Sequence, residues 1–222
     1  MGKITKALIT VRSGSKRVKN KNLRTFSDSN LLTIKIKQMQ RIKGVNAVQV
    51  NSNDDTMLQI GKDLGCEIFK RDEYYATDMV STNELRKNAA ENLDADIILV
   101  TNCTNPLISD ETIEKALEFY HNMSDEYDSL NTAHEVKDFL WLNGKAYNYN
   151  PDKTPRSQDL PDILGLDSAL NIISRDRMIE ISNFVGRNPY LYKISALEAT
   201  DIDTELDFEV AEYLYNKLRG NL

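Results

Sequence analysis

The sequence predicts an α/β fold in which a mostly parallel sheet is flanked by helices. Strand-like and helix-like segments alternate at least four times in the first 120 residues, as in parallel sheets with crossover helices. Residues 96–100 are almost continuously apolar, which is typical of a strand buried on both faces of such a sheet. With 222 residues and 41% hydrophobic side chains, we expect residues 1–222 to form a single domain.

The first half of the chain supplies most of the expected sheet. An apolar run at residues 6–11 predicts the first strand, and the small residues that follow it predict a tight loop. Ser81 with Glu84 forms a capping box, and Gly65 is placed to end a helix. The segments that follow are a helix at 31–42, a strand at 45–50, a helix at 54–64, a strand at 66–69, a helix at 81–93, a strand at 96–100 and a helix at 109–120.

The second half is less regular. Residues 143–168 are polar, rich in Tyr, Asn, Pro and Asp, and show no periodicity, so we expect them to leave the sheet as an arm. The other segments are strands at 129–133, 139–142, 169–173 and 189–194, with helices at 175–181 and 205–217.

Composition excludes several classes of protein. A net charge of −6 argues against general nucleic-acid binding, which needs a basic face. The longest apolar runs are too short to span a bilayer, and the N-terminus lacks the features of a signal peptide. Cys66 and Cys103 lie in apolar surroundings and are expected to be free thiols. We therefore expect a cytoplasmic protein that binds neither nucleic acid nor membrane.

One segment is strongly basic in this acidic chain. Residues 12–24 carry six basic side chains and no acidic one. Backbone N–H groups around Ser13, Gly14 and Ser15 can converge on an anion, and Lys and Arg side chains add the charge that holds a polyphosphate. The segment is neither a P-loop nor a G-x-G-x-x-G motif, and the alternative interpretation is a solvated basic loop.

Two acidic residues near the C-terminus form a second candidate site. Asp201 and Asp203 alternate, so in an extended segment both carboxylates point the same way and can bind Mg²⁺ together with phosphate oxygens. The alternative is that Asp203 or Thr204 caps the helix expected from Glu205. The polar turn at 101–107 follows the buried strand and is a third candidate, and His134 is a possible pocket residue.

Four segments together resemble the acylneuraminate cytidylyltransferase family. RSGSK at residues 12–16, with KNL at 21–23, resembles its signature loop. In the same order along the chain, Arg71 with ATD at 76–78 and ST at 81–82, TNPL at 104–107, and DIDTELD at 201–207 resemble three further family motifs. The resemblance covers nearly the whole chain.

The resemblance implies a Rossmann-like nucleotidyltransferase domain with a protruding dimerisation arm at 143–168. It implies a homodimer in which CTP and an anionic sugar acceptor give a CMP-sugar and pyrophosphate, with Mg²⁺ as cofactor. By position, the triphosphate would be held by Arg12, Lys16 and Lys21 with Ser13, Gly14 and Ser15; the cytidine by Asn22, Arg71 and Thr82; the metal by Asp201 and Asp203; and the acceptor by Asn102, Arg156 and Gln158.

The sequence also departs from the family pattern. Arg17 stands where the family has Gly, and Lys19-Asn20 where it has Pro. Gly165 stands where a carboxylate-binding Arg is usual, so we expect Arg156 to take over the acceptor anion, with Arg17 as the alternative. The open alternatives for function are a different anionic acceptor, such as a phosphonate, or a catalytically silent relative that binds nucleotide or sugar.

Overall fold

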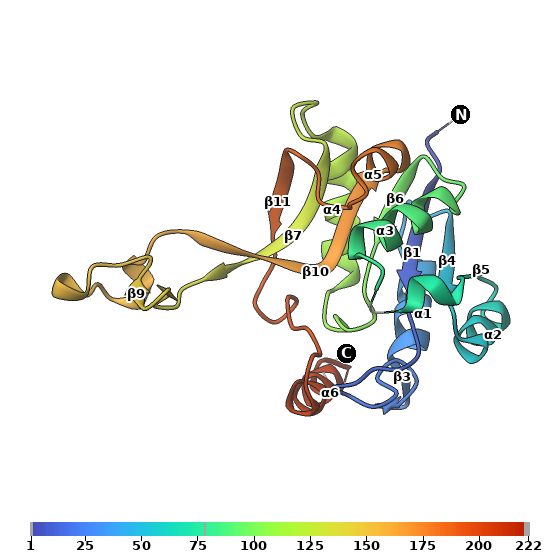
Figure 1. Ribbon diagram of the computed structural model, residues 1–222, viewed down its shortest axis with the longest axis horizontal. Coiled ribbons are helices and arrows are strands. Elements are labelled where there is room, and N and C mark those ends of the chain that lie inside the picture. The colour runs from blue at the N-terminus through green and yellow to red at the C-terminus, as the bar shows by residue number, and fades with distance from the viewer. Residues whose placement is uncertain (1, 78, 220–222) are drawn as a thin grey trace.

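A seven-stranded sheet forms the centre of the protein in the computed structural model, which describes residues 2–77 and 79–219 (Figure 1). Asp78, part of one family motif, lies outside these residues. The strands are β1 (Thr5–Thr10), β4 (Ala47–Ser52), β5 (Glu67–Lys70), β6 (Ile97–Val100), β7 (Ser129–Val136), β10 (Ile163–Ser174) and β11 (Pro189–Lys193). A separate short hairpin joins β2 (Thr25–Phe26) to β3 (Ser29–Asn30).

The sheet is mostly parallel, as predicted. Its order is β11-β7-β10-β6-β1-β4-β5, and β10 is the described strand that runs antiparallel to both of its neighbours. The chain moves from β1 outward through β4 and β5 and then returns to β6 on the other side of β1. Such a reversal opens a crevice at the carboxyl ends of the two strands. The fold therefore directs a ligand to the ends of β1 and β6.

Six α-helices flank the sheet within the described ranges. Ser81 caps its helix by accepting the backbone N–H of Glu84, and Ser109 accepts that of Thr112, each at 3.1 Å. These bonds explain why the sequence locates the two helix starts well. The helices are α1 (Leu31–Arg41), α2 (Asp55–Asp63), α3 (Thr82–Glu91), α4 (Asp110–Asn122), α5 (Arg175–Ile181) and α6 (Glu205–Arg219).

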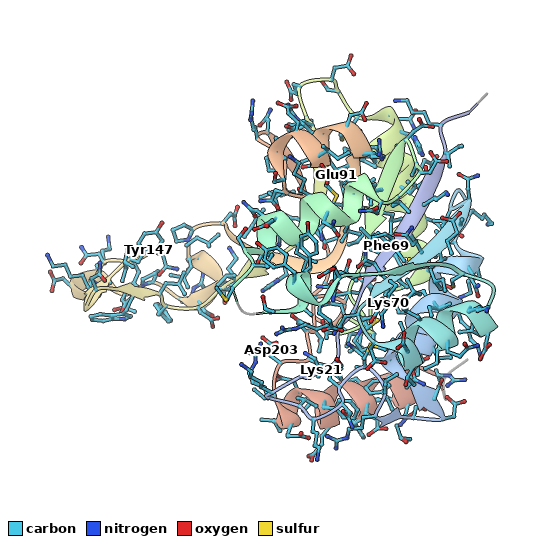
Figure 2. All side chains as sticks on the ribbon, turned by 45° about the vertical axis from the view of Figure 1, so that its right-hand side comes forward. Lys21, Phe69, Lys70, Glu91, Tyr147 and Asp203 are labelled. Carbon is cyan, nitrogen blue, oxygen red and sulfur yellow. The ribbon has the colours of Figure 1, made fainter. Side chains whose placement is uncertain are left out.

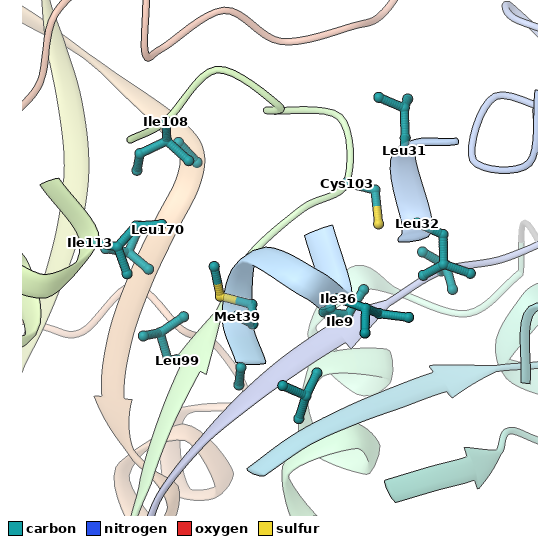
Figure 3. Close-up of a cluster of buried hydrophobic side chains, with 14 of the residues drawn as sticks. Ile9, Leu31, Leu32, Ile36, Met39, Leu99, Cys103, Ile108, Ile113 and Leu170 are labelled. Carbon is teal, nitrogen blue, oxygen red and sulfur yellow. The ribbon is translucent and has the colours of Figure 1, made fainter. Parts of the chain in front are cut away.

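The core is divided between the two faces of the sheet. Successive side chains of a strand point to opposite faces, so Ile9 of β1 packs into the larger cluster and Leu8 into the smaller one. The larger cluster contains Ile36 and Met39 of α1 together with Leu99 of β6 (Figure 3). The smaller cluster lies under α3 and α5, which contact each other. Burying each large aliphatic side chain contributes about 1.5–3 kcal/mol.

An arm projects from the sheet at the ends of β7 and β10 (Figure 1). The two strands pair from Ile163 opposite Val136 to Leu166 opposite Ala133, so they form the base of the arm as an antiparallel ribbon. Beyond them lie a hairpin of β8 (Trp141–Leu142) with β9 (Lys145–Ala146) and the short 3-10 helices η2 (Pro151–Lys153) and η3 (Ser157–Asp159).

Two predicted strand boundaries in this region are wrong. The strand expected at 139–142 is limited to Trp141–Leu142 and pairs within the arm rather than with the main sheet. The strand expected at 169–173 already begins at Ile163. The pairing register shifts between Leu166 and Asn171, and such a bulge interrupts the alternation on which the sequence analysis relied.

The two cysteines are free, as predicted. Cys66 is half-buried and Cys103 is buried, and burial raises their pKa values to about 11 and about 12. In the described part of the chain, no helix is both long enough and apolar enough to cross a membrane.

A lysine is fully buried in α1. The ammonium group of Lys35 donates to Gln38 Oε1 at 2.8 Å and to the carbonyl of Asn105 at 2.9 Å. No carboxylate pairs with it among residues 2–77 and 79–219. Burial is the main cause that lowers the pKa of Lys35 from 10.5 to about 8. The ammonium therefore connects α1 to the turn after β6.

The contribution of Lys35 to stability should depend on pH. Between about pH 8 and 10.5 the unfolded chain holds a proton on this lysine that the folded chain has lost, so raising the pH favours the folded state. Relative to Lys35→Met, the free energy of unfolding of the wild type should rise by up to roughly 3 kcal/mol across this interval. Urea unfolding of both proteins at pH 7.5 and 10 measures the difference; parallel pH dependences would contradict it.

Candidate active site

The loop after β1 has a fixed backbone. Gly14 has φ +79°, in the left-handed region that favours glycine. The carbonyl of Asn20, itself at φ 54°, accepts the N–H groups of Leu23 at 2.9 Å and Arg24 at 2.7 Å. Val18 is almost completely buried and anchors the loop in the larger cluster. The turn and this anchor hold the backbone while most of the basic side chains stay at the surface.

Two of these basic side chains reach the loop before α6. The ammonium group of Lys21 donates to the carbonyl of Ile202, 181 positions away, and lies 3.9 Å from the Asp203 carboxylate (Figure 2). The Arg17 guanidinium lies 2.8 Å from the same carboxylate. Burial lowers the pKa of Lys21, although Asp201 and Asp203 oppose the shift. The basic segment and the pair of aspartates, which were the two strongest signals in the sequence, therefore form one cluster of side chains.

The Asp203 carboxylate is not used as a helix cap. The hydroxyl of Thr204 accepts the N–H of Asp207 at 3.2 Å, and the Asp207 carboxylate accepts the N–H groups of Thr204 at 2.7 Å and Asp203 at 3.0 Å. The start of α6 is therefore satisfied by Thr204 and Asp207. Of the two caps that the sequence allowed, the structure uses Thr204, and the Asp203 carboxylate faces the basic loop.

Asp201 lies beside Asp203 against the turn after β6. Part of the residue is open to solvent, yet its carboxyl group bonds to the Thr104 side chain, and desolvation there, with the nearby Asp203 carboxylate, raises the pKa of Asp201. Two adjacent carboxylates with a desolvated member fit a hard divalent cation that takes its other oxygens from phosphate and water. No group of three or more His, Cys, Asp or Glu side chains suited to a metal occurs in the described ranges.

The turn at 101–107 holds this loop in place. Asn105 is fully buried, and its amide nitrogen donates to the carbonyl of Thr200 at 3.1 Å. The N–H of Ile202 donates to the carbonyl of Thr104 at 3.0 Å. Because the Lys35 ammonium donates to the Asn105 carbonyl, hydrogen bonds connect α1 through this turn to the backbone on either side of Asp201.

Arg71 is buried beneath the basic loop. It is 1% exposed, and its guanidinium donates to the carbonyl of Val11 at 3.0 Å and to Asn51 Oδ1 at 3.2 Å. Burial, with the nearby Arg12 charge, lowers the pKa of Arg71 to about 10. The guanidinium of Arg12 donates to the Ala76 carbonyl at 3.0 Å. Arg71 therefore supports the end of β1 from below.

A pocket of about 230 Å³ opens at the carboxyl ends of β1 and β6, between α3 and α5. Thr82 and Asn102, both predicted as substrate contacts, line it together with Thr10 and Ser168. Thr10 precedes Arg12 by two residues, so the pocket and the basic loop adjoin along β1. The pocket lies where the strand order predicts a ligand site.

The remaining loop residues lie near these groups. Asn53 donates to the Ser13 hydroxyl at 3.5 Å, which joins the loop to the end of β4. Asn22 is largely buried, and its carbonyl accepts the N–H of Leu32 at 3.2 Å. Ser15 is half-buried and Lys16 is exposed on the same loop.

The predicted acceptor residues of the arm are not in the pocket. The Arg156 guanidinium pairs with Asp159 through two hydrogen bonds of 2.8 and 3.2 Å, and Gln158 lies in the same exposed turn. Neither residue lines the pocket. Within one chain, the structure leaves both of them on the arm.

Gly165, where the family usually has an arginine, is covered by His134. A Cβ atom at Gly165 would lie 3.0 Å from His134 Cε1 and 3.2 Å from Val136 Cγ2. A larger residue would therefore require the imidazole ring to move. His134 lies 3.8 Å from Asp167, in the ribbon at the base of the arm rather than in the pocket.

The sequence analysis missed Arg86 and Phe184, which also line the pocket. Arg86 follows Thr82 by four positions in α3, so both lie on the same helix face. That spacing could have identified Arg86 from the sequence. Phe184 follows α5, and no feature of the sequence indicated its place in the pocket.

Comparison with solved structures defines the class of fold. A CMP:2-keto-3-deoxy-manno-octonic acid synthetase complexed with CTP superposes with a TM-score of 0.73 at 15% identity, covering 96% of this chain and 99% of that one. Together with the strand order, this similarity assigns the chain a Rossmann-like nucleotidyltransferase fold, as the resemblance implied.

The sequence itself assigns the family. The sequence profile of the family described as Cytidylyltransferase matches residues 6–218, and the chain belongs to this family. The post-translational flagellin modification protein B of Campylobacter coli is 26% identical over 93% of this chain and 92% of that protein. The CMP-N,N'-diacetyllegionaminic acid synthase of Campylobacter jejuni is 25% identical over the same shares. The resemblance identified from the four motifs is thus confirmed.

Proposed function

We propose that this chain transfers CMP from CTP to a hydroxyl group of a sugar acid and releases pyrophosphate. The observation that carries the proposal is the meeting of the basic loop with Asp203, beside a pocket at the switch point of the sheet. Family membership supports the cytidylyl transfer. A relative of similar length is named for the synthesis of a CMP-linked acid, which supports a sugar acid as acceptor.

The chemistry needs positioning and charge neutralisation more than covalent catalysis. An acceptor oxygen attacks the α-phosphorus of CTP, the bond from this phosphorus to the bridging oxygen breaks, and pyrophosphate leaves. The acceptor proton passes to water. Arg12, Lys16 and Lys21 would neutralise the charge that grows on the departing pyrophosphate. Their loop begins at the edge of the pocket, so the nucleoside and the acceptor would lie between Thr82 and Asn102.

The two aspartates would hold Mg²⁺ together with phosphate oxygens. The desolvation of Asp201 beside Asp203 supports this role, because a cation would relieve the repulsion between the carboxylates. When bound, such an ion polarises a phosphoryl oxygen and favours attack at phosphorus. Lys21 and Arg17 hold Asp203 in position for it.

A homodimer joined through the arm is part of the proposal. Several large apolar side chains of the arm are exposed, including Trp141, Leu142 and Tyr147. Figure 2 labels Tyr147 on the arm, far from the sheet. An exposed aromatic surface of this kind is typical of an interaction site.

The nucleotide preference tests the proposed activity. A site that buries the hydrogen-bonding edge of cytosine leaves polar groups unpaired with uracil, so kcat/KM for CTP should exceed that for UTP by about 10²–10⁴. Pyrophosphate release is measured with CTP, UTP, ATP and GTP, using N-acetylneuraminate and N,N'-diacetyllegionaminate as acceptors. Equal rates with UTP would contradict the cytidine assignment. No release from any nucleotide would contradict transfer to either of these sugar acids.

The aspartates are tested by amide substitution. Asp201→Asn and Asp203→Asn should each lower kcat by about 10²–10³, because each removes charge that stabilises the transition state. Glu209→Gln, at an exposed position of α6, makes the same change of charge outside the site and should leave kcat unaffected. Near-normal Mg²⁺-dependent rates in both aspartate variants would show that the pair holds no catalytic metal.

A further inference from the structure

The pocket between α3 and α5 contains a single charged side chain among the described residues that line it. That residue is Arg86; its neighbours there are apolar or carry neutral hydroxyl and amide groups. The guanidinium has no carboxylate partner within the described part of the chain. A half-buried cation in a neutral pocket attracts an anion more than a fully solvated cation does, because the protein excludes part of the water that would screen the charge.

Arg86 is held rigidly from two sides. Its guanidinium lies over the Phe184 ring, 3.9 Å from the centroid, and donates to Asn183 Oδ1 at 2.7 Å. Asn183 is itself fixed, because its side-chain oxygen also accepts the N–H of Val185 at 3.2 Å. A guanidinium has five N–H donors, and stacking leaves their edge directions available. A guanidinium fixed in this way suits a carboxylate or a phosphonate, and it loses little conformational entropy when such a group binds.

The other candidate cations for the acceptor are committed elsewhere. Arg156 already pairs bidentately with Asp159 on the arm, and Arg17 pairs with Asp203 in the loop before α6. Gly165 has no side chain, and His134 covers the position.

We propose that Arg86 binds the anionic group of the acceptor in the pocket between α3 and α5. This inference rests on the proposed cytidylyl transfer and assigns its acceptor site. Thr82, one helical turn away, and Asn102, at the end of β6, line the same pocket. The acid group would thus be held on α3, while the reacting hydroxyl points along β1 toward the basic loop.

Steady-state kinetics with N-acetylneuraminate test the assignment. Arg86→Ala should raise the KM for this acid by about ten- to a hundredfold, the effect of losing a charge-assisted hydrogen bond, and should change the KM for CTP less than about threefold. Arg86→Lys should recover only part of the loss. Lys87→Ala removes a neighbouring exposed cation that pairs with Glu91 and should change neither KM. An unchanged acid KM in Arg86→Ala overturns the proposal, as does a loss seen in Arg156→Ala alone.

A binding measurement separates this assignment from the activity. Calorimetric titration in the presence of CTP and EDTA compares N-acetylneuraminate, its methyl ester and 2-aminoethylphosphonate, with thermal unfolding as a check that each variant is folded. If the wild type binds either acid but not the ester, and folded Arg86→Ala loses this binding, the anchor is supported even without turnover. The acid that binds more tightly identifies the anionic group of the acceptor. Equal binding of acid and ester, or binding of no probe by the wild type, overturns the anchor. The activity proposal is judged by pyrophosphate release alone.

Discussion

The convergence of a cationic loop with the carboxylates before α6 is the constraint on which the site depends. Six basic side chains in one short segment repel one another unless opposite charge is supplied. The protein supplies part of it through Asp203, which faces Lys21 and Arg17, and through Glu205, which pairs with Arg24. A bound triphosphate would add further negative charge. Residues from the two ends of the chain thus meet at the proposed triphosphate site.

Buried polar side chains beneath this edge of the sheet fix the positions of the segments that meet in the site. Buried polar groups are costly unless they are paired, so the hydrogen bonds of Lys35 and Asn105 define one arrangement of the turn and of the loop it holds. Arg71 has the same function beneath the end of β1, where it fixes Val11 and Asn51. The exposed residues of the site are thus positioned by buried groups beneath them.

Much of the fold could be predicted from the sequence, and so could the basic loop and the aspartates that meet in the site, because caps, apolar periodicity and charge runs are local signals. The strand of residues 163–174 could not, since the bulge after Leu166 disrupts the alternation. The support given by Lys35 could not either, because a lysine in a helix is usually solvated. Arg86 and Phe184 become neighbours only when α3 packs on α5, a contact between segments almost a hundred positions apart.

The most direct test of the proposed phosphate and metal site is the affinity for CTP of Asp203→Asn, measured by calorimetry with EDTA and then with excess Mg²⁺. Without the ion, the Asp203 carboxylate repels the triphosphate and competes for Lys21, so the variant should bind CTP more tightly than the wild type, by roughly threefold or more. With Mg²⁺ the order should reverse, because the variant has lost a ligand. A change of the same sign in both buffers would contradict the account.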